Sequence, residues 1–190
     1  MKKTDIIVLP NTRLRERSKK VGIIDSIVTK LIKGMQEATL DWEDSREHEV
    51  GVALAAVQVN QPYRVVVIRN NFDDKADRSF SIFINPTITK YEGKLEEDYE
   101  GCLSVPDIYG KVPRYSKVRI RAMDENGRYF RVTATGFLAR IFQHEIDHNN
   151  GIMFVDHIKG LTNNFFKLLP DGQLKQLDYE KDIRTNRILW

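Results

Sequence analysis

The feature that most constrains the fold of this chain is the run Gln143 to His148, in which two histidines stand four positions apart in the pattern H-E-x-x-H. The apolar residues around it recur at intervals of three and four, the spacing of one face of an α-helix. On a helix, His144 and His148 lie one turn apart on the same face, where two imidazole nitrogens can bind one metal ion. Glu145 then lies beside the ion without binding it.

Glu145 occupies the position of a general base. A divalent ion lowers the pKa of a coordinated water toward neutrality, and a neighbouring carboxylate can take the proton. The helix is predicted to end near Gly151, since glycine commonly follows the last helical residue. The motif is short enough to occur by chance, and the alternative interpretation is a helix with two surface histidines.

Composition indicates one globular domain. The 190 residues are 41% hydrophobic and 30% charged, as in ordinary folded proteins. The formal net charge of +3 permits an anionic partner without requiring one, and we expect no DNA partner. The longest apolar run, 50–59, is about half the length that a bilayer requires, so we expect no membrane partner. The apolar stretch 6–9 is too short for a signal peptide, which favours the cytoplasm.

Hydrophobic periodicity predicts the elements around the motif. A helix is expected from Asp25 or Ser26 to about Leu40, and a buried strand at 64–69. Short strands are expected at 81–85 and 87–90, separated by Pro86. Residues 117–123 and 130–134 alternate in hydrophobicity on either side of Asn126-Gly127, which is typical of a β-hairpin.

Several strands followed by one motif-bearing helix indicate an α+β fold. We expect antiparallel β-strands packed around a central helix that carries the H-E-x-x-H motif, with an additional N-terminal helix. Residues 1–160 are predicted to form a single catalytic domain, and residues 161–190 a partly helical C-terminal extension with a short helix near 165–169.

The third metal ligand is not determined by these patterns. Two histidines leave a tetrahedral ion in need of at least one more protein ligand and an open position. Cys102 is the single cysteine, so it cannot form an internal disulfide, and its thiolate would bind zinc or ferrous iron strongly. His48, in a charged loop, and His157, well past the helix, are the other imidazoles that could serve.

Three segments taken together carry a family resemblance: 51–58 (GVALAAVQ), 100–104 (EGCLS) and 143–148 (QHEIDH). Their order and spacing closely resemble the three signature motifs of the peptide deformylase family. The resemblance extends over about residues 6–158. Three linked motifs are far more specific than H-E-x-x-H alone.

The resemblance implies one divalent metal ion bound by Cys102, His144 and His148. Ferrous iron is the first expectation, with zinc or nickel as alternatives. The substrate would be the N-formyl group on the initiator methionine of new polypeptides. Asp147 is a candidate acceptor for the second ring nitrogen of a ligand histidine.

The same resemblance implies the catalytic roles. Water would attack the formyl carbon, and Glu145 would carry a proton from water to the departing amine. The Gln58 amide and the backbone N–H of Leu103 would stabilise the oxyanion. The residues carried over for peptide binding are Val52, Ala53 and Gly101 along the backbone, and Phe137 and Ile141 around the methionine side chain.

This chain departs from the family pattern at three positions. Ala53 stands where the first motif usually has a second glycine, and Asn149 replaces the usual leucine after the second histidine. Tyr109 stands where many bacterial members have an arginine that helps to hold the peptide. These changes concern the peptide groove and the packing of the helix, not the reacting groups.

Two other functions compete with deformylation. H-E-x-x-H is also the signature of metallopeptidases, although a cysteine ligand and Gln58 argue against one. A catalytically silent protein with a structural metal is the second alternative, and the intact Glu145 argues against it. The C-terminal tail has a small positive excess, so it either packs on the domain or brings the enzyme to the ribosome.

Overall fold

The computed structural model describes residues 1–185 and residue 189. In the described residues it has an antiparallel seven-stranded sheet with helices, in the strand order β1-β2-β3-β4-β6-β7 and with β5 on β4. The strands are β1 (Ala53–Ala55), β2 (Val65–Arg69), β3 (Phe80–Cys102), β4 (Val105–Met123), β5 (Tyr129–Thr135), β6 (Phe165–Leu168) and β7 (Leu174–Gln176). The helices are α1 (Ser26–Glu43), α2 (Gly136–Asn149) and α3 (Phe154–His157), with short turns η1 (Lys3–Asp5), η2 (Thr12–Arg15), η3 (Ala56–Val59) and η4 (Tyr179–Arg184). The predicted α+β class is confirmed.

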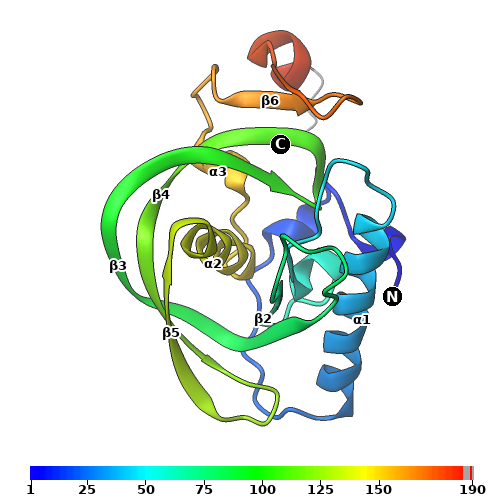
Figure 1. Cartoon of the computed structure of the whole chain (residues 1–190), viewed down its shortest axis with the longest axis vertical. Helices are drawn as coiled ribbons and strands as arrows, with labels where there is room; N and C mark the ends of the chain where they lie inside the picture. The colour runs from blue at the N-terminus through cyan, green and yellow to red at the C-terminus, as the bar shows by residue number, and fades with distance from the viewer. Residues whose placement is uncertain (186–188, 190) are drawn as a thin grey trace.

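The two longest strands curve around helix α2 (Figure 1). We predicted two short strands separated by Pro86, and this is wrong, because β3 continues through the proline to Cys102. The pairing register with β4 shifts between Ile84 and Thr87, so Pro86 falls in a bulge. Further shifts follow along the strand, and bulges bend a strand, which explains the curvature.

The predicted hairpin is the β4–β5 pair. Val118, Ile120 and Ala122 on β4 are opposite Ala134, Val132 and Phe130 on β5. The turn uses Gly127 at φ +78°, in the left-handed region that favours glycine. The local pattern therefore predicted both the strands and their register.

Helix α1 begins where the sequence predicts and runs three residues further. The Asp25 carboxylate accepts hydrogen bonds from the backbone N–H groups of Ile27 and Val28, at 2.9 and 3.0 Å, as an N-cap does. The helix then packs its apolar face on β1 and β2. The buried side chains of that face include Val28, Leu31, Ile32 and Met35.

Helix α2 carries the motif through the middle of the fold, and most of its side chains are buried. Its apolar residues pack against the inner face of the curved sheet, in a cluster with Phe83, Val118 and Ile120. The chain turns away at Gly151, which has φ +76° and faces the Arg15 carbonyl so closely that a Cβ would collide with it. The predicted stop of the helix is thus confirmed.

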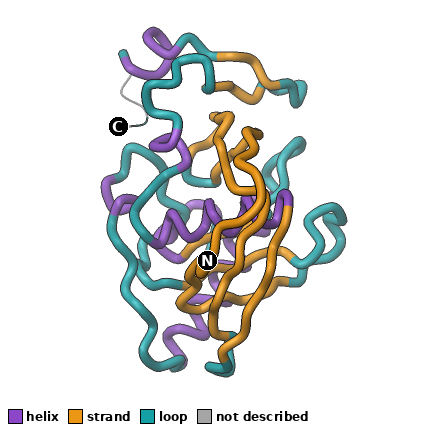
Figure 2. The backbone as a smooth tube through the Cα atoms, turned by 90° about the vertical axis from the view of Figure 1, so that its left-hand side faces the viewer, coloured by secondary structure: helices purple, strands orange, loops and turns teal. Residues whose placement is uncertain are grey.

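The C-terminal segment continues the sheet. The short helix predicted near 165–169 is wrong, because these residues form β6, which pairs with β4 at the register Tyr109 to Phe166. Strand β7 completes a hairpin, and η4 is a helical turn that follows it (Figure 2). Residues 186–188 and 190 of the predicted extension lie outside the described residues. Throughout the described part of the chain, every helix is too short or too polar to cross a bilayer.

Candidate metal centre and adjoining pocket

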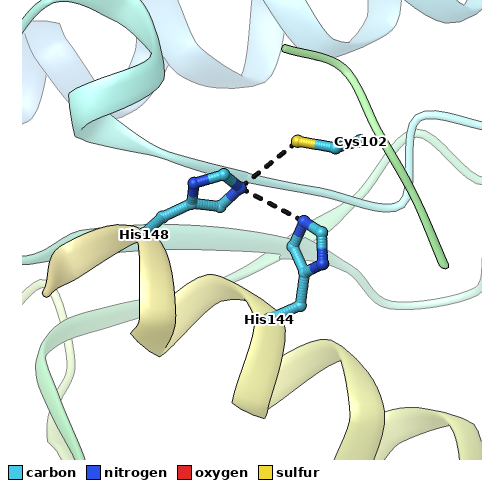
Figure 3. Close-up of side chains that lie close together, drawn as sticks. All are labelled: Cys102, His144 and His148. Atoms are coloured by element: carbon cyan, nitrogen blue, oxygen red, sulfur yellow. Dashed lines mark hydrogen bonds between the residues drawn. The ribbon is translucent and has the colours of Figure 1, made fainter. Parts of the chain in front are cut away.

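The motif histidines face each other on α2. Their rings are 4.8 Å apart between centroids, and the two Nε2 atoms are 3.1 Å apart (Figure 3). Both side chains are buried, because the curved sheet surrounds the helix. The helical spacing predicted this arrangement, and the fold removes it from bulk water.

Cys102 completes the cluster from the end of β3. Its Sγ lies 3.3 Å from Nε2 of His148, and the three candidate ligand atoms all lie within 4.8 Å of one another. Ligand atoms of a tetrahedral ion with bonds of 2.0–2.3 Å stand roughly 3.3–3.7 Å apart, so these residues fit a divalent ion. One thiolate and two imidazoles suit zinc, iron or nickel.

The other two histidines are held elsewhere. Nε2 of His48 is 3.1 Å from the carbonyl oxygen of Pro170, and Nε2 of His157 is 2.7 Å from Asp147. Of the three residues that the sequence left open as a third ligand, Cys102 is the one that lies with His144 and His148.

A pocket of about 190 Å³ opens beside this cluster. The residues predicted from the sequence that line it are Val52, Ala53, Gln58, Gly101, Cys102, Leu103, Phe137, Ile141, His144 and Glu145. His148 lies behind them, in contact with Cys102 and His144. Residues from three separate segments of the chain therefore meet at one cavity.

Gln58 is oriented by hydrogen bonds at both ends of its amide group. Its Oε1 accepts a hydrogen bond from the backbone N–H of Ala55 at 2.8 Å. Its Nε2 is thereby directed toward the metal cluster, where it lies 3.0 Å from Ser104 Oγ and 3.4 Å from Cys102 Sγ. The amide thus presents its donor side at the inner end of the pocket.

Glu145 is buried, and its Oε2 makes no hydrogen bond to any described residue. Burial raises the pKa of this carboxyl to about 7. A carboxyl with a pKa near neutrality can both take and return a proton, and an oxygen without a protein partner can hydrogen-bond a reactant.

A charge network that the sequence did not predict holds the first histidine. Glu100 Oε2 lies 3.0 Å from Nδ1 of His144, and both Arg114 and Arg140 donate to the same carboxylate. Burial acts to raise the pKa of Glu100, but the hydrogen bonds from His144 and Arg114 outweigh it and keep the pKa below its usual range. This fixed anion orients the ring of His144.

Asp147 forms ion pairs with Arg114 and His157. The sequence suggested it as the acceptor for a ligand histidine, and Glu100 takes that position for His144. Glu100 adjoins Gly101 and Cys102 in the sequence, but no periodic signal marks it as buried. Its role depends on pairing between β3 and β4, which local patterns do not specify.

Further residues that line the pocket were missed by sequence reasoning. They are Trp42, Glu49, Val50, Tyr99, Glu100 and Arg140. Tyr109, noted as a departure from the family pattern, also lines the pocket and donates a hydrogen bond from its hydroxyl to Glu49 at 2.8 Å. Burial, followed by the nearby Glu49 carboxylate, raises the pKa of Tyr109, which keeps the phenol protonated.

Comparison with known proteins adds a second line of support. A sequence model described as polypeptide deformylase matches residues 3–164. The chain is 39% identical over 172 residues to peptide deformylase 1 of Pseudomonas syringae pv. tomato, covering 90% of this chain and 96% of that protein. It is 40% identical over 156 residues to the peptide deformylase of Aquifex aeolicus, covering 82% of this chain and 88% of that protein.

Solved structures agree in fold. A peptide deformylase from Synechococcus elongatus in complex with actinonin superposes with a TM-score of 0.73 at 37% identity, covering 80% of this chain and 78% of that one. A peptide deformylase from Legionella pneumophila gives a TM-score of 0.71 at 40% identity, covering 82% and 86%. The likeness therefore includes most of each chain.

Proposed function

This chain belongs to the polypeptide deformylase family, and from that premise we infer that it is a hydrolase that removes the N-formyl group from the initiator methionine of newly made polypeptides and releases formate. The observation that carries this inference is the meeting of Cys102, His144 and His148 beside a pocket that also presents Glu145 and Gln58. A peptidase or a silent binding protein of the H-E-x-x-H type would not by itself require the cysteine or the oriented amide.

Cys102, His144 and His148 would hold one divalent metal ion. When bound, the ion supplies Lewis acidity, which polarises the formyl carbonyl and lowers the pKa of the attacking water. The remaining chemistry belongs to residues of the chain.

Glu145 is the proton carrier in this proposal. Its carboxylate accepts a proton from water as the water oxygen bonds to the formyl carbon, and it returns the proton to the amine nitrogen as the carbon–nitrogen bond breaks. The immediate products are formic acid and a neutral amino terminus, and transfer of the acid proton to the amine gives formate and an ammonium group, so atoms and charge balance. Burial and the unpaired Oε2 support this role.

Gln58 and Leu103 are proposed to stabilise the oxyanion between these two events. The Gln58 amide already directs its Nε2 toward Cys102, and Leu103 lines the same pocket. Loss of one such donor typically costs on the order of a hundredfold in rate.

The peptide is proposed to bind as an added strand along the pocket. The Val52, Ala53 and Gly101 backbone would pair with it, and Phe137 and Ile141 would contact the methionine side chain. The Tyr109 ring packs against Gly101 so closely that a Cβ there would lie 2.6 Å from it, so this position requires glycine.

The test compares two peptides. The purified protein, loaded with iron under low oxygen, is incubated with a formyl-Met tripeptide and with the same tripeptide unformylated. We expect formate from the first and no cleavage of a peptide bond in either. Hydrolysis of the unformylated peptide would favour a metallopeptidase instead.

We propose ferrous iron as the native metal, with zinc or nickel able to replace it. A thiolate next to ferrous iron is open to oxidation, so the iron form should lose activity in air faster than the nickel form. Elemental analysis of protein purified without oxygen measures the native metal directly. Equal lifetimes in air, or a zinc-loaded protein, would contradict iron.

We further propose that the protein acts in the cytoplasm, where formylated chains emerge, and that residues 1–160 hold the catalytic machinery. The extension 161–190 would contact ribosomal phosphates. Lys167 and Lys175 are exposed and directly opposite each other on β6 and β7, so they present two cations on one face.

Charge substitutions test this docking without removing buried side chains. The variant with Lys167→Ala and Lys175→Ala should co-sediment less with ribosomes at low salt and keep full turnover of free peptide. The matched control replaces Lys30 and Lys33, two exposed lysines of α1. If the hairpin variant co-sediments with ribosomes as the parent does, the extension packs on the domain and does not dock the ribosome through these lysines.

A further inference from the structure

The C-terminal hairpin contacts both walls of the substrate pocket. One wall is the loop wall, residues 44–52, which contributes Glu49, Val50 and Val52. The other is the strand wall, which contributes Tyr99, Gly101 and Tyr109 from β3 and β4. The hairpin, residues 165–176, lies outside the pocket and contributes no lining residue to it.

Phe166 supports the strand wall. It is opposite Tyr109 in the β4–β6 register, and its ring packs edge-on against that of Tyr99, with centroids 5.0 Å apart. Lys111 Nζ lies over both rings, 5.2 Å from Tyr99 and 5.7 Å from Phe166. Phe166 therefore restrains two tyrosines that line the pocket.

The turn of the hairpin supports the loop wall. The Pro170 carbonyl oxygen is 3.1 Å from Nε2 of His48, which lies one residue before Glu49. Gly172 packs against the same imidazole, since a Cβ there would be 3.1 Å from its Cγ. The turn of the hairpin thus holds His48, which does not itself line the pocket.

Two hydrogen bonds join the loop wall to β4, and one of them runs from Arg46 Nη1 to Asp107 Oδ1, two residues before Tyr109. The Tyr109 hydroxyl donates to Glu49 Oε1 at 2.8 Å, and Arg46 lies 3.4 Å from the other carboxylate oxygen. The Tyr109 ring also lies directly over Gly101. A shift of either wall would therefore be transmitted to Gly101, where the peptide backbone is proposed to bind.

We propose that the hairpin is a positioning element for the peptide groove, and that His48 and Phe166 are positioning residues that set its width for the residues following methionine. This inference rests on the proposed function. Neither side chain touches the metal cluster, so their effect should fall on peptide binding rather than on the chemical step. A second functional role for the C-terminal segment follows, separate from any docking to the ribosome.

The experiment measures kcat and KM for Phe166→Ala and His48→Ala with two substrates. Formyl-methionine amide reaches only the metal cluster and the methionine pocket, whereas a formyl-Met tripeptide extends along the groove. For the tripeptide, we expect KM to rise about three- to tenfold, because one aromatic or hydrogen-bond contact is lost. The value of kcat should stay within about twofold of that of the parent. With formyl-methionine amide, kcat/KM should stay within about twofold.

Two controls keep the outcome interpretable. Tyr129→Ala removes an exposed aromatic ring from β5, outside the pocket, and should leave both substrates unaffected. Phe166→Tyr keeps the ring and should restore the tripeptide KM. Metal content and the thermal midpoint are measured for every variant, so that a loss of folding is recognised.

Two results would overturn the proposal: an equal loss with both substrates, or no change with either. Wild-type protein that releases no formate from the tripeptide would instead reject the proposed function. The two failures are therefore distinguishable in the same set of assays.

Discussion

At the scale of single residues, the four histidines show how position decides chemistry. His144 and His148 share a helix face and the buried side chain of Cys102 as a neighbour, whereas His48 contacts a carbonyl oxygen and His157 an aspartate. The side chains are identical, and the difference lies in the donors and acceptors that the fold brings to each ring. Residue type alone therefore did not identify the third ligand.

Substitutions at Cys102 and Glu145 should separate the ligand from the proton carrier. Cys102→Ala removes a thiolate ligand, so the purified variant is expected to lose its metal. Glu145→Gln preserves the shape of the side chain and should retain the metal while losing about a hundredfold or more in activity. Elemental analysis and formate release measure the two effects. A fully metal-loaded Cys102→Ala protein would contradict the ligand assignment.

Asn149, which stands where the family usually has leucine, should cost stability. Its side chain is fully buried, and neither amide atom hydrogen-bonds to a described residue. Ser18, whose backbone N–H donates to the Asn149 carbonyl at 3.0 Å, also has a buried hydroxyl without such a partner. Because an unpaired buried polar group costs about 1–3 kcal/mol, Asn149→Leu should raise the free energy of unfolding by about 1 kcal/mol.

Urea denaturation of the metal-loaded protein checks this expectation. Asn149→Ala is the control for volume, since it removes the amide without adding a larger side chain. If both variants are less stable than the parent, the amide is hydrogen-bonded in solution and the prediction is wrong.

At the scale of elements, a buried ion pair joins α1 to β2. Arg69 Nη1 lies 2.7 Å from Glu43 Oε2, and the two side chains are 0% and 2% exposed. Arg69→Met would leave Glu43 buried without a counter-charge, which typically costs about 3–5 kcal/mol. We expect urea denaturation of this variant to give a free energy of unfolding that is lower than that of the parent by about this amount.

An exposed pair on the same sheet is the matched control. Arg119 and Glu92 form an ion pair at 2.6 Å between β4 and β3, with the arginine side chain 51% exposed. Arg119→Met should change the free energy of unfolding by at most about 1 kcal/mol. Equal effects of Arg69→Met and Arg119→Met would contradict the role assigned to burial.

Elements with local signals were predicted well. Helix α1 has an N-cap at Asp25, the β4–β5 hairpin has Asn126-Gly127, and α2 has helical periodicity, so each could be located from neighbouring residues. The length of β3 was missed because its bulge at Pro86 tolerates a residue that normally ends a strand. Strand β6 was missed because it exists through pairing with β4, more than fifty residues away in the chain.

The candidate site also combines residues that local motifs predict with residues that only long-range packing places. The three proposed ligands and Glu145 could be proposed from linked motifs. Cys102, His144 and Glu145 line one pocket, and His148 lies next to Cys102 and His144. The buried network of Glu100 with Arg114 and Arg140 could not be proposed in this way, because it depends on the β3–β4 register and on where α2 crosses the sheet. Charged residues usually lie on the protein surface, but Glu100, Arg114 and Arg140 are all buried.

At the scale of the whole molecule, the described chain has three hydrophobic clusters. The first lies between α1 and the β1–β2 side of the sheet, and the second surrounds α2. The third joins the C-terminal segment to the end of β3. Its buried members include Leu14, Cys102, Phe154, Phe165, Ile183 and Leu189. Cys102, the proposed third metal ligand, therefore belongs to the same packed cluster as the C-terminal extension.

Removal of the extension should for that reason affect the metal centre as well as stability. A chain ending at Gly160 loses Phe165, Ile183 and Leu189 from the third cluster, and loss of one large buried side chain alone costs about 3–5 kcal/mol. Since typical domains are stable by about 5–15 kcal/mol, we expect the shortened chain to lose cooperative unfolding in urea and to bind less metal than the full chain. A chain ending at Leu177 keeps Phe165 and the hairpin and should be intermediate in both measurements. The opposite result would be a chain of residues 1–160 that unfolds at the same urea concentration as the parent and binds a full complement of metal. It would show that the third cluster contributes neither to stability nor to metal binding.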